Sequence, residues 1–263
     1  MPELTRNGVV IHWEEQGEGP GLFVAHSMIS MPSNFDALLR NLATDHHVVT
    51  CDLRGTGEST RTGPYDMRTD AEDMAAVIEE SGHPVVAVAL GYNPVPLGVV
   101  TTRPELVDAL VLVGGLPRLG SREGAEDVSL FESDAVVEVV LEMMESNPQA
   151  LLRTAISMGN PQMSEAEVRE RLEEQLAYYP PEVGVERGKA HLAYDATRAC
   201  AALGRRLWII HWENPISPAD AFKRVGQRLP EAQLFEVEDG PISRPDLTAE
   251  IVREAAASLG GSP

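Results

Sequence analysis

Long hydrophobic runs are missing from this 263-residue sequence. No run of apolar residues approaches the about 20 that a helix needs to cross a bilayer. The first residues, Met-Pro-Glu-Leu-Thr-Arg, also lack the apolar segment of a secretory signal. We therefore expect a cytoplasmic protein with no membrane-spanning segment.

Positive charge is also scarce. Lys189 and Lys223 are the only lysines, and 41 acidic against 21 basic residues give a formal net charge of -20 at pH 7. Such a charge repels phosphate backbones and anionic lipid head groups. The sequence therefore predicts neither a nucleic-acid partner nor a membrane-surface partner.

Cysteine is limited to Cys51 and Cys200, which have no CxxC spacing. This pattern predicts neither a disulfide framework nor a thiolate metal site. Clustered metal ligands, a P-loop and the G-x-G-x-x-G pattern of dinucleotide-binding proteins are absent from the sequence too. We expect no metal, no cofactor and a small molecule as the partner, and the sequence leaves open whether the chain forms a homodimer.

The sequence does contain an alternation of apolar runs and helical patterns, and its 43% hydrophobic content is enough for a sizeable core. Strands are predicted at 9–13, 22–25, 48–51, 85–89, 109–113, 207–210 and 233–237. Helices are predicted at about 35–42, 69–81 and 248–259, with a short one before Arg103. This alternation predicts an α/β fold with a doubly wound, mostly parallel sheet.

The middle of the chain has a different pattern. From about 122 to 200 the sequence is typical of glutamate-rich helices, interrupted by Asn-Pro and Pro-Pro pairs, and it has no convincing strand. We expect an inserted helical cap at 122–200 and a core formed by 1–121 and 201–263.

Three motifs occur in the order found in the α/β-hydrolase superfamily. Residues 25–27, Ala-His-Ser, resemble its His-Gly loop, and residues 52–59 resemble its D-x-R-G-x-G-x-S segment. Residues 103–107, followed by an apolar strand, resemble the helix end and strand of that fold. The resemblance covers nearly the whole chain, and it implies that Asp52 and Arg54 hold their loop rather than act in catalysis.

Active members of this superfamily carry a nucleophile in a G-x-S-x-G turn between a strand and a helix. Residues 90–95 read Leu-Gly-Tyr-Asn-Pro-Val, and the spacing admits Gly91, Tyr92 or Asn93 at the nucleophile position. None of the three has an aliphatic hydroxyl, a thiol or a carboxylate. If Asn93 holds the position, Pro94 also removes an amide that would bind the oxyanion.

The other two triad positions are also exchanged. Asn214 stands where the resemblance implies an aspartate, and an amide does not stabilise an imidazolium as a carboxylate does. No histidine occurs after residue 237, and Ser243 stands where a dioxygenase-type segment of the superfamily has its base. The resemblance therefore implies a degenerate triad and not a conventional serine hydrolase.

Three residues near the turn are candidate catalytic groups. His26 could act as an acid or a base, Tyr92 could stabilise an oxyanion or shuttle a proton, and Asn93 could hold a carbonyl group. Each also has a structural interpretation: His26 shapes its loop, Tyr92 fills the altered site, and Asn93 is a good turn residue.

The expected substrate-binding residues lie around the same turn and after the two C-terminal strands. They are Ser27, Met28, Gly91, Trp212, Glu213, Asn214 and Ser243. Methionines in the loop and the cap predict an adaptable apolar lining. The ligand is therefore expected to be a small, largely apolar organic molecule.

Three functions remain open. The first is a cofactor-free, non-hydrolytic enzyme of cyclase, lyase or isomerase type, such as those of secondary metabolism, and it is favoured if His26 lies within hydrogen-bond reach of Tyr92. The second is a catalytically inactive binding protein, which a filled pocket would favour. The third is a hydrolase with relocated catalytic residues, which needs a serine such as Ser27 or Ser30 against His26.

Overall fold

The computed structural model describes residues 2–27, 30–82, 84–120, 134–159, 162–213 and 219–259. In these ranges the chain forms one eight-stranded sheet with the order β1-β2-β4-β3-β5-β6-β7-β8. The strands are β1 (Glu3–Arg6), β2 (Val9–Gln16), β3 (Gly21–His26), β4 (His47–Cys51), β5 (Val85–Leu90), β6 (Val107–Val113), β7 (Leu207–His211) and β8 (Gln233–Glu236). Pairing is antiparallel from β1 through β2 to β4 and parallel from β4 to β8.

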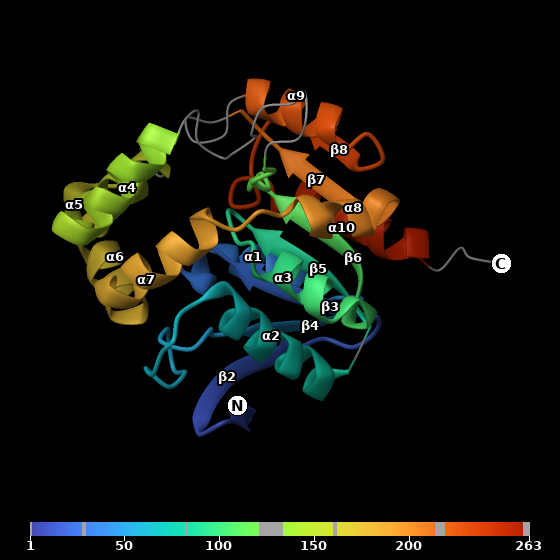
Figure 1. The fold of residues 1–263 in the computed structure, drawn as a ribbon, viewed down its shortest axis with the longest axis horizontal. Coiled ribbons are helices and arrows are strands. Elements are labelled where there is room, and N and C mark those ends of the chain that lie inside the picture. The colour runs from blue at the N-terminus through green and yellow to red at the C-terminus, as the bar shows by residue number, and fades with distance from the viewer. Residues whose placement is uncertain are drawn as a thin grey trace.

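Helices cover both faces of this sheet (Figure 1). The α-helices are α1 (Asp36–Leu42), α2 (Met67–Ser81), α3 (Val95–Thr102), α4 (Asp134–Ser146), α5 (Pro148–Gly159), α6 (Glu165–Tyr178), α7 (Pro181–Leu192), α8 (Thr197–Leu203), α9 (Ala219–Arg228) and α10 (Pro245–Leu259). Short 3-10 helices are η1 (Pro32–Phe35), η2 (Pro104–Leu106) and η3 (Gly204–Arg206). The predicted α/β fold with a doubly wound, mostly parallel sheet is therefore confirmed.

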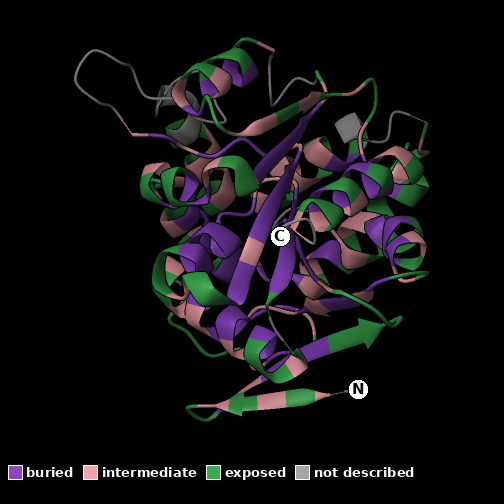
Figure 2. Cartoon of the chain, turned by 90° about the vertical axis from the view of Figure 1, so that its right-hand side faces the viewer, coloured by how far each residue is buried: buried purple, intermediate pink, exposed green. Residues whose placement is uncertain are grey.

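Two apolar layers hold the helices to the sheet. One contains buried residues of α2, α3, α8 and α9, and the other contains buried residues of α1 and α10. The inner strands are buried on both faces, as Figure 2 shows, and β5 is buried along its whole length. Parallel strands covered on both faces have nearly continuous apolar sequences, which is why these runs were recognisable.

The sequence signals did not reveal every element. The edge strand β1 alternates half-buried with exposed residues, and its four residues are too short for a strong pattern. Helix α9 was also not predicted. Helix α2 begins two residues earlier than expected because the Asp66 side chain accepts a hydrogen bond from the Thr69 amide at 2.8 Å.

Helices α4 to α7 form a layer beside the carboxyl ends of the strands (Figure 1). This layer of four helices is called the cap from here on. Within it, α4 packs against α5 and α7, and α5 packs against α6. Helix α8, which begins near the end of the predicted cap range, packs instead against α3. Among the described helices, none combines the length and the apolar character needed to cross a membrane.

A buried ion pair joins α2 to the loop after β4. Asp73 is fully buried and accepts two hydrogen bonds from Arg54, from Nε at 2.6 Å and from Nη2 at 2.8 Å. Arg6 of β1 adds a third contact to this carboxylate at 3.2 Å. The expected role of Arg54 in holding its loop agrees with these contacts.

Replacing Asp73 by alanine would leave the Arg54 guanidinium buried without its counter-ion. We expect the Asp73→Ala variant to lose about 3–5 kcal/mol of unfolding free energy, measured by urea denaturation. Asp36→Ala is the matched control, because Asp36 forms only an exposed pair with Arg40 at 3.7 Å. The control should lose about 1 kcal/mol or less, and equal losses in the two variants would contradict this account.

Candidate functional site

The candidate site lies at the carboxyl ends of β3 and β5. Chain order reverses at this point of the sheet, since β3 leads to β4 on one side and β5 leads to β6 on the other. Ligands of open α/β sheets bind in the crevice at such a switch point. His26 pairs in register with Leu90, so the residues that follow these two strands meet here.

Gly91 forms the sharp turn between β5 and α3. Its φ is +68°, whereas Asn7 is the only non-glycine residue with positive φ in the described chain. The strained turn of this fold is the nucleophile position in active members. Of the three registers that the sequence left open, the backbone therefore favours Gly91.

The space beside Gly91 is occupied. A Cβ atom at Gly91 would lie 2.9 Å from Cβ of Ser27 and 3.1 Å from its Oγ. Ser27 is buried, and its hydroxyl lies 3.0 Å from that of Ser30. A side chain at the turn would therefore require Ser27 to move.

Asn93 ties the turn to the end of β3. Its Nδ2 donates to the carbonyl of His26 at 2.7 Å, and its Oδ1 accepts from the Val95 amide at 3.0 Å. Both ends of the amide are used by the chain, although Asn93 still lines a pocket. This geometry favours the structural interpretation of Asn93 over a direct role in holding a substrate carbonyl.

The side chain of Trp212 lies between the loop that follows β6 and the loop that follows β8. A Cβ atom at Gly114 would lie 2.1 Å from the indole ring, and one at Gly240 would lie 2.6 Å from it. In active members the resemblance implies a catalytic acid after β7 and a histidine after β8. The Trp212 ring lies against Gly114 and Gly240, and a Cβ atom at either glycine would overlap with it.

The other predicted binding residues are less informative. Glu213 and Ser243 are exposed. Met28 and Asn214 fall outside the described residues, and so does any test of the aspartate position at Asn214.

His26 joins a hydrogen-bonded chain that runs from the core into the cap. Tyr178 of α6 donates to Asp52 Oδ1 at 2.5 Å, and the phenol oxygen lies 2.9 Å from His26 Nε2. The Nδ1 atom of His26 lies 3.3 Å from the Ser27 carbonyl. Because the phenol proton goes to Asp52, Nε2 carries a proton and donates it to the phenol oxygen. Only the charged ring has a second proton, on Nδ1, for the Ser27 carbonyl.

Burial shifts the pKa values of His26 and Tyr178, the two titratable rings in this series of hydrogen bonds. Desolvation lowers the pKa of His26, although the Ser27 carbonyl and Asp52 oppose the effect. Burial and the neighbouring Asp52 carboxylate hold the pKa of Tyr178 well above its ordinary value. Tyr178 is therefore a hydrogen-bond donor at neutral pH, and His26 is the group that changes charge.

Tyr92 lies elsewhere. Its hydroxyl donates to the backbone carbonyl of His191 at 2.8 Å, and burial raises the pKa of the phenol. A hydrogen bond between His26 and Tyr92 would have favoured the non-hydrolytic enzyme, and this condition is not met, because His26 contacts Tyr178 instead. Tyr92 thus connects the turn to the end of α7.

A second polar cluster closes the same pocket from the cap. The Asp70 carboxylate of α2 accepts bonds from Arg187 Nε at 2.8 Å and Nη2 at 3.0 Å, and it lies 3.0 Å from His191 Nε2. Arg187 and His191 are four residues apart, so they share a face of α7. All three side chains are fully buried.

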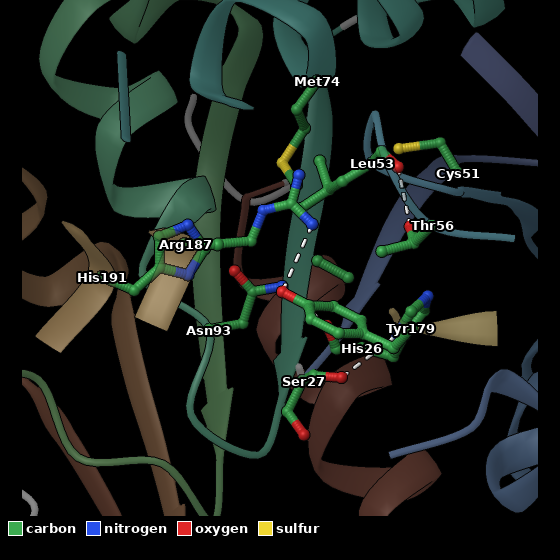
Figure 3. A pocket seen from close by; sticks show the side chains of 11 residues that line it. His26, Ser27, Cys51, Leu53, Thr56, Met74, Asn93, Tyr179, Arg187 and His191 are labelled. Atoms are coloured by element: carbon green, nitrogen blue, oxygen red, sulfur yellow. Dashed lines mark hydrogen bonds between the residues drawn. The ribbon is translucent and has the colours of Figure 1, made fainter. Parts of the chain in front are cut away.

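The pocket between these clusters has a volume of about 20 Å³, which is room for about one water-sized group. Figure 3 shows Arg187 and His191 together at one side of it and Cys51 with Thr56 at the other. Its lining comprises Ala25, His26, Ser27, Cys51, Leu53, Thr56, Met74, Asn93, Tyr179, Arg187 and His191. No group of three metal-ligating side chains occurs among the residues that the structure describes.

Sequence reasoning missed the cap's contribution to this site. Tyr178, His191, Asp70 and Arg187 were not among the predicted site residues. The one usable signal was a charged pair, Asp70 and Asp73, three residues apart on an otherwise apolar helix face.

Known proteins resemble this chain over nearly its full length. The family model described as "Alpha/beta hydrolase family" matches residues 12–251. The putative carbamate hydrolase RutD of Azorhizobium caulinodans is 24% identical over 99% of this chain and 98% of its own length.

Solved structures show the same fold. A thermophilic esterase from Thermogutta terrifontis has a TM-score of 0.74 and 18% identity, covering 98% of this chain and 99% of its own. A bromoperoxidase from Bacillus anthracis has a TM-score of 0.75 and 17% identity, covering 97% and 96%.

The crowding at Gly91 predicts a stability difference between two glycines with positive φ. Gly91→Ala should lose about 1–2 kcal/mol of unfolding free energy from backbone strain, and about 1–3 kcal/mol more from the contact with Ser27. Gly8→Ala is the control, because Gly8 has a φ of +79° and nothing within 4 Å of its Cβ position. Equal losses in urea denaturation would show that the turn has room for a side chain.

Proposed function

The chain belongs to the Alpha/beta hydrolase family, and we propose that it is a cofactor-free, non-hydrolytic enzyme of isomerase, lyase or cyclase type. Its substrate would be a small, largely apolar organic molecule, held between the carboxyl ends of the strands and the cap. The observation that carries this proposal is the Asp52–Tyr178–His26 chain, which ends on the pocket.

The altered turn supports a reaction without an acyl-enzyme. Gly91 offers no nucleophile, and a side chain there would contact Ser27. No histidine follows residue 237 to complete a triad. A reaction that needs only proton transfer would not depend on these positions.

The hydrogen-bonded chain supplies acid–base chemistry instead. When His26 carries both ring protons, all its polar contacts are satisfied and it can give up a proton. When it is neutral, Asp52 and Tyr178 keep the ring oriented, as a carboxylate orients the imidazole of a catalytic triad. Burial lowers the pKa of His26 and so favours the neutral ring, which can accept a proton.

Hydrolysis through a relocated serine has less support. Ser27 lies nearest the turn, but its hydroxyl faces Ser30 and not a histidine nitrogen. The ring nitrogens of His26 face Tyr178 and the Ser27 carbonyl. Relatives named as hydrolases are the argument for this alternative. Hydrolysis would need a base beside the serine, and among the described residues neither ring nitrogen of His26 faces a serine hydroxyl.

A binding protein without catalysis is the second candidate function. It is favoured by the small volume of the pocket and by the partners that both nitrogens of His26 already have. The two candidates differ in whether a bound ligand is changed.

The test begins with native mass spectrometry of protein purified from its own host, to identify a retained small molecule. We expect the wild type to convert this molecule, and Tyr178→Phe to lower the rate by about 10²–10⁴-fold because the ring of His26 loses its support. Tyr194→Phe is the matched control, since its hydroxyl contacts Thr101 and the Leu97 carbonyl instead.

Each result bears on one candidate. Conversion by the wild type and the control, with loss in Tyr178→Phe, supports the enzyme. A ligand that all three proteins bind and none alters would establish a binding protein and overturn the proposal.

A further inference from the structure

The pocket is lined by a buried ring nitrogen, Nδ1 of His191, that takes no part in the hydrogen bonds described above. The His191 ring is fully buried and lines the pocket. Its Nε2 faces Asp70 at 3.0 Å, whereas its Nδ1 has no hydrogen-bond partner among the described residues. The ring is thus fixed by one nitrogen and leaves the other for a ligand.

The contacts of Asp70 define the tautomer of this ring. Arg187 donates to both carboxylate oxygens, so Asp70 is ionised and can only accept. The proton of the neutral imidazole therefore lies on Nε2, and Nδ1 carries a lone pair. Burial lowers the pKa of His191, against the opposing influence of Asp70, and this keeps the ring neutral at pH 7.

The position of the atom distinguishes it from other buried groups. The indole N–H groups of Trp13 and Trp208 also lack partners among the described residues, but they lie in the two apolar layers and do not line this pocket. An unpaired buried acceptor is costly, whereas a donor from a bound molecule removes that cost. His191 Nδ1 is the unpaired acceptor that a ligand entering the pocket would meet.

We propose that His191 Nδ1 is the acceptor that binds the ligand of this pocket and takes its proton during turnover, and that the ligand is a small neutral molecule with a hydroxyl or N–H group. The inference rests on the proposed function and adds the base to it. Because the cavity of about 20 Å³ holds one water-sized group, only the donor group enters it, and the larger apolar part of the ligand stays outside.

The proton balance of the step is simple. The O–H or N–H bond of the ligand breaks, its electron pair stays on the ligand, and the proton forms a bond to Nδ1. The resulting imidazolium lies against the Asp70 carboxylate, and the ligand anion lies beside the Arg187 guanidinium, which lines the same pocket. The His191 imidazolium can then return this proton to another atom of the ligand, so one ring serves in turn as the base and the acid that an isomerase needs.

Nitrogen NMR of the histidine rings tests the binding role, with phenol as the probe and toluene as its control without a donor. We expect the His191 Nδ1 resonance of the free protein to be that of an unprotonated nitrogen, and to shift with phenol but not with toluene. The resonance is assigned by its absence from the spectrum of His191→Gln. A protonated Nδ1 in the free protein, no response to phenol, or an equal response to toluene would overturn the proposal.

Turnover of the retained ligand tests the catalytic role. His191→Gln keeps a hydrogen-bond acceptor but has no basic nitrogen, so kcat should fall by about 10²–10⁴-fold with a smaller change in KM. His47→Gln is the control, because His47 begins β4 at the opposite end of the strands from the pocket and bonds Glu15 at 2.8 Å. Thermal unfolding of both variants checks that the cap remains in place.

The outcomes separate this inference from the function on which it rests. If the wild type converts its ligand and His191→Gln does so equally well, the proposed function stands and the base is wrong. If nothing is converted but phenol shifts the His191 resonance, the binding site stands and the enzymatic function fails.

Discussion

The cap is held over the sheet by a buried carboxylate of the core. Asp70 on α2 accepts hydrogen bonds from Arg187 and His191 of α7, and Arg187 also donates to the Arg54 carbonyl at 2.5 Å. A buried guanidinium is tolerated only when its charge and its donors are satisfied, so α7 has little freedom to lie elsewhere. The pocket, its closure and the orientation of the His191 ring all depend on this arrangement.

The site of this fold is formed by strand ends and loops, so its side chains can change while the sheet stays the same. The turn after β5 keeps the positive φ of the fold, but with glycine, and Ser27 and Trp212 fill the neighbouring space. These exchanges fit together sterically, since the bulky Trp212 requires Gly114 and Gly240. Polar function is concentrated instead between the end of β3 and the cap.

Sequence patterns were sufficient for strands β2 to β8 and insufficient for the site. Strands such as β5 and β6 were recognisable because burial on both faces requires a continuous apolar run, whereas β1 is a short edge strand without such a run. The absence of serine from residues 90–95 was also visible, because these residues form one short motif. Tyr178 and His191 were out of reach, since their partners Asp52 and Asp70 are more than 100 positions away, and no local pattern encodes such contacts.

Labelling with a fluorophosphonate, followed by intact-protein mass spectrometry, tests the central claim most directly. This reagent modifies serines that a neighbouring base has activated. The account predicts no covalent adduct, because Gly91 holds the turn and Ser27 faces another hydroxyl. An adduct on Ser27, Ser30 or any other serine would show an activated nucleophile and would contradict the account.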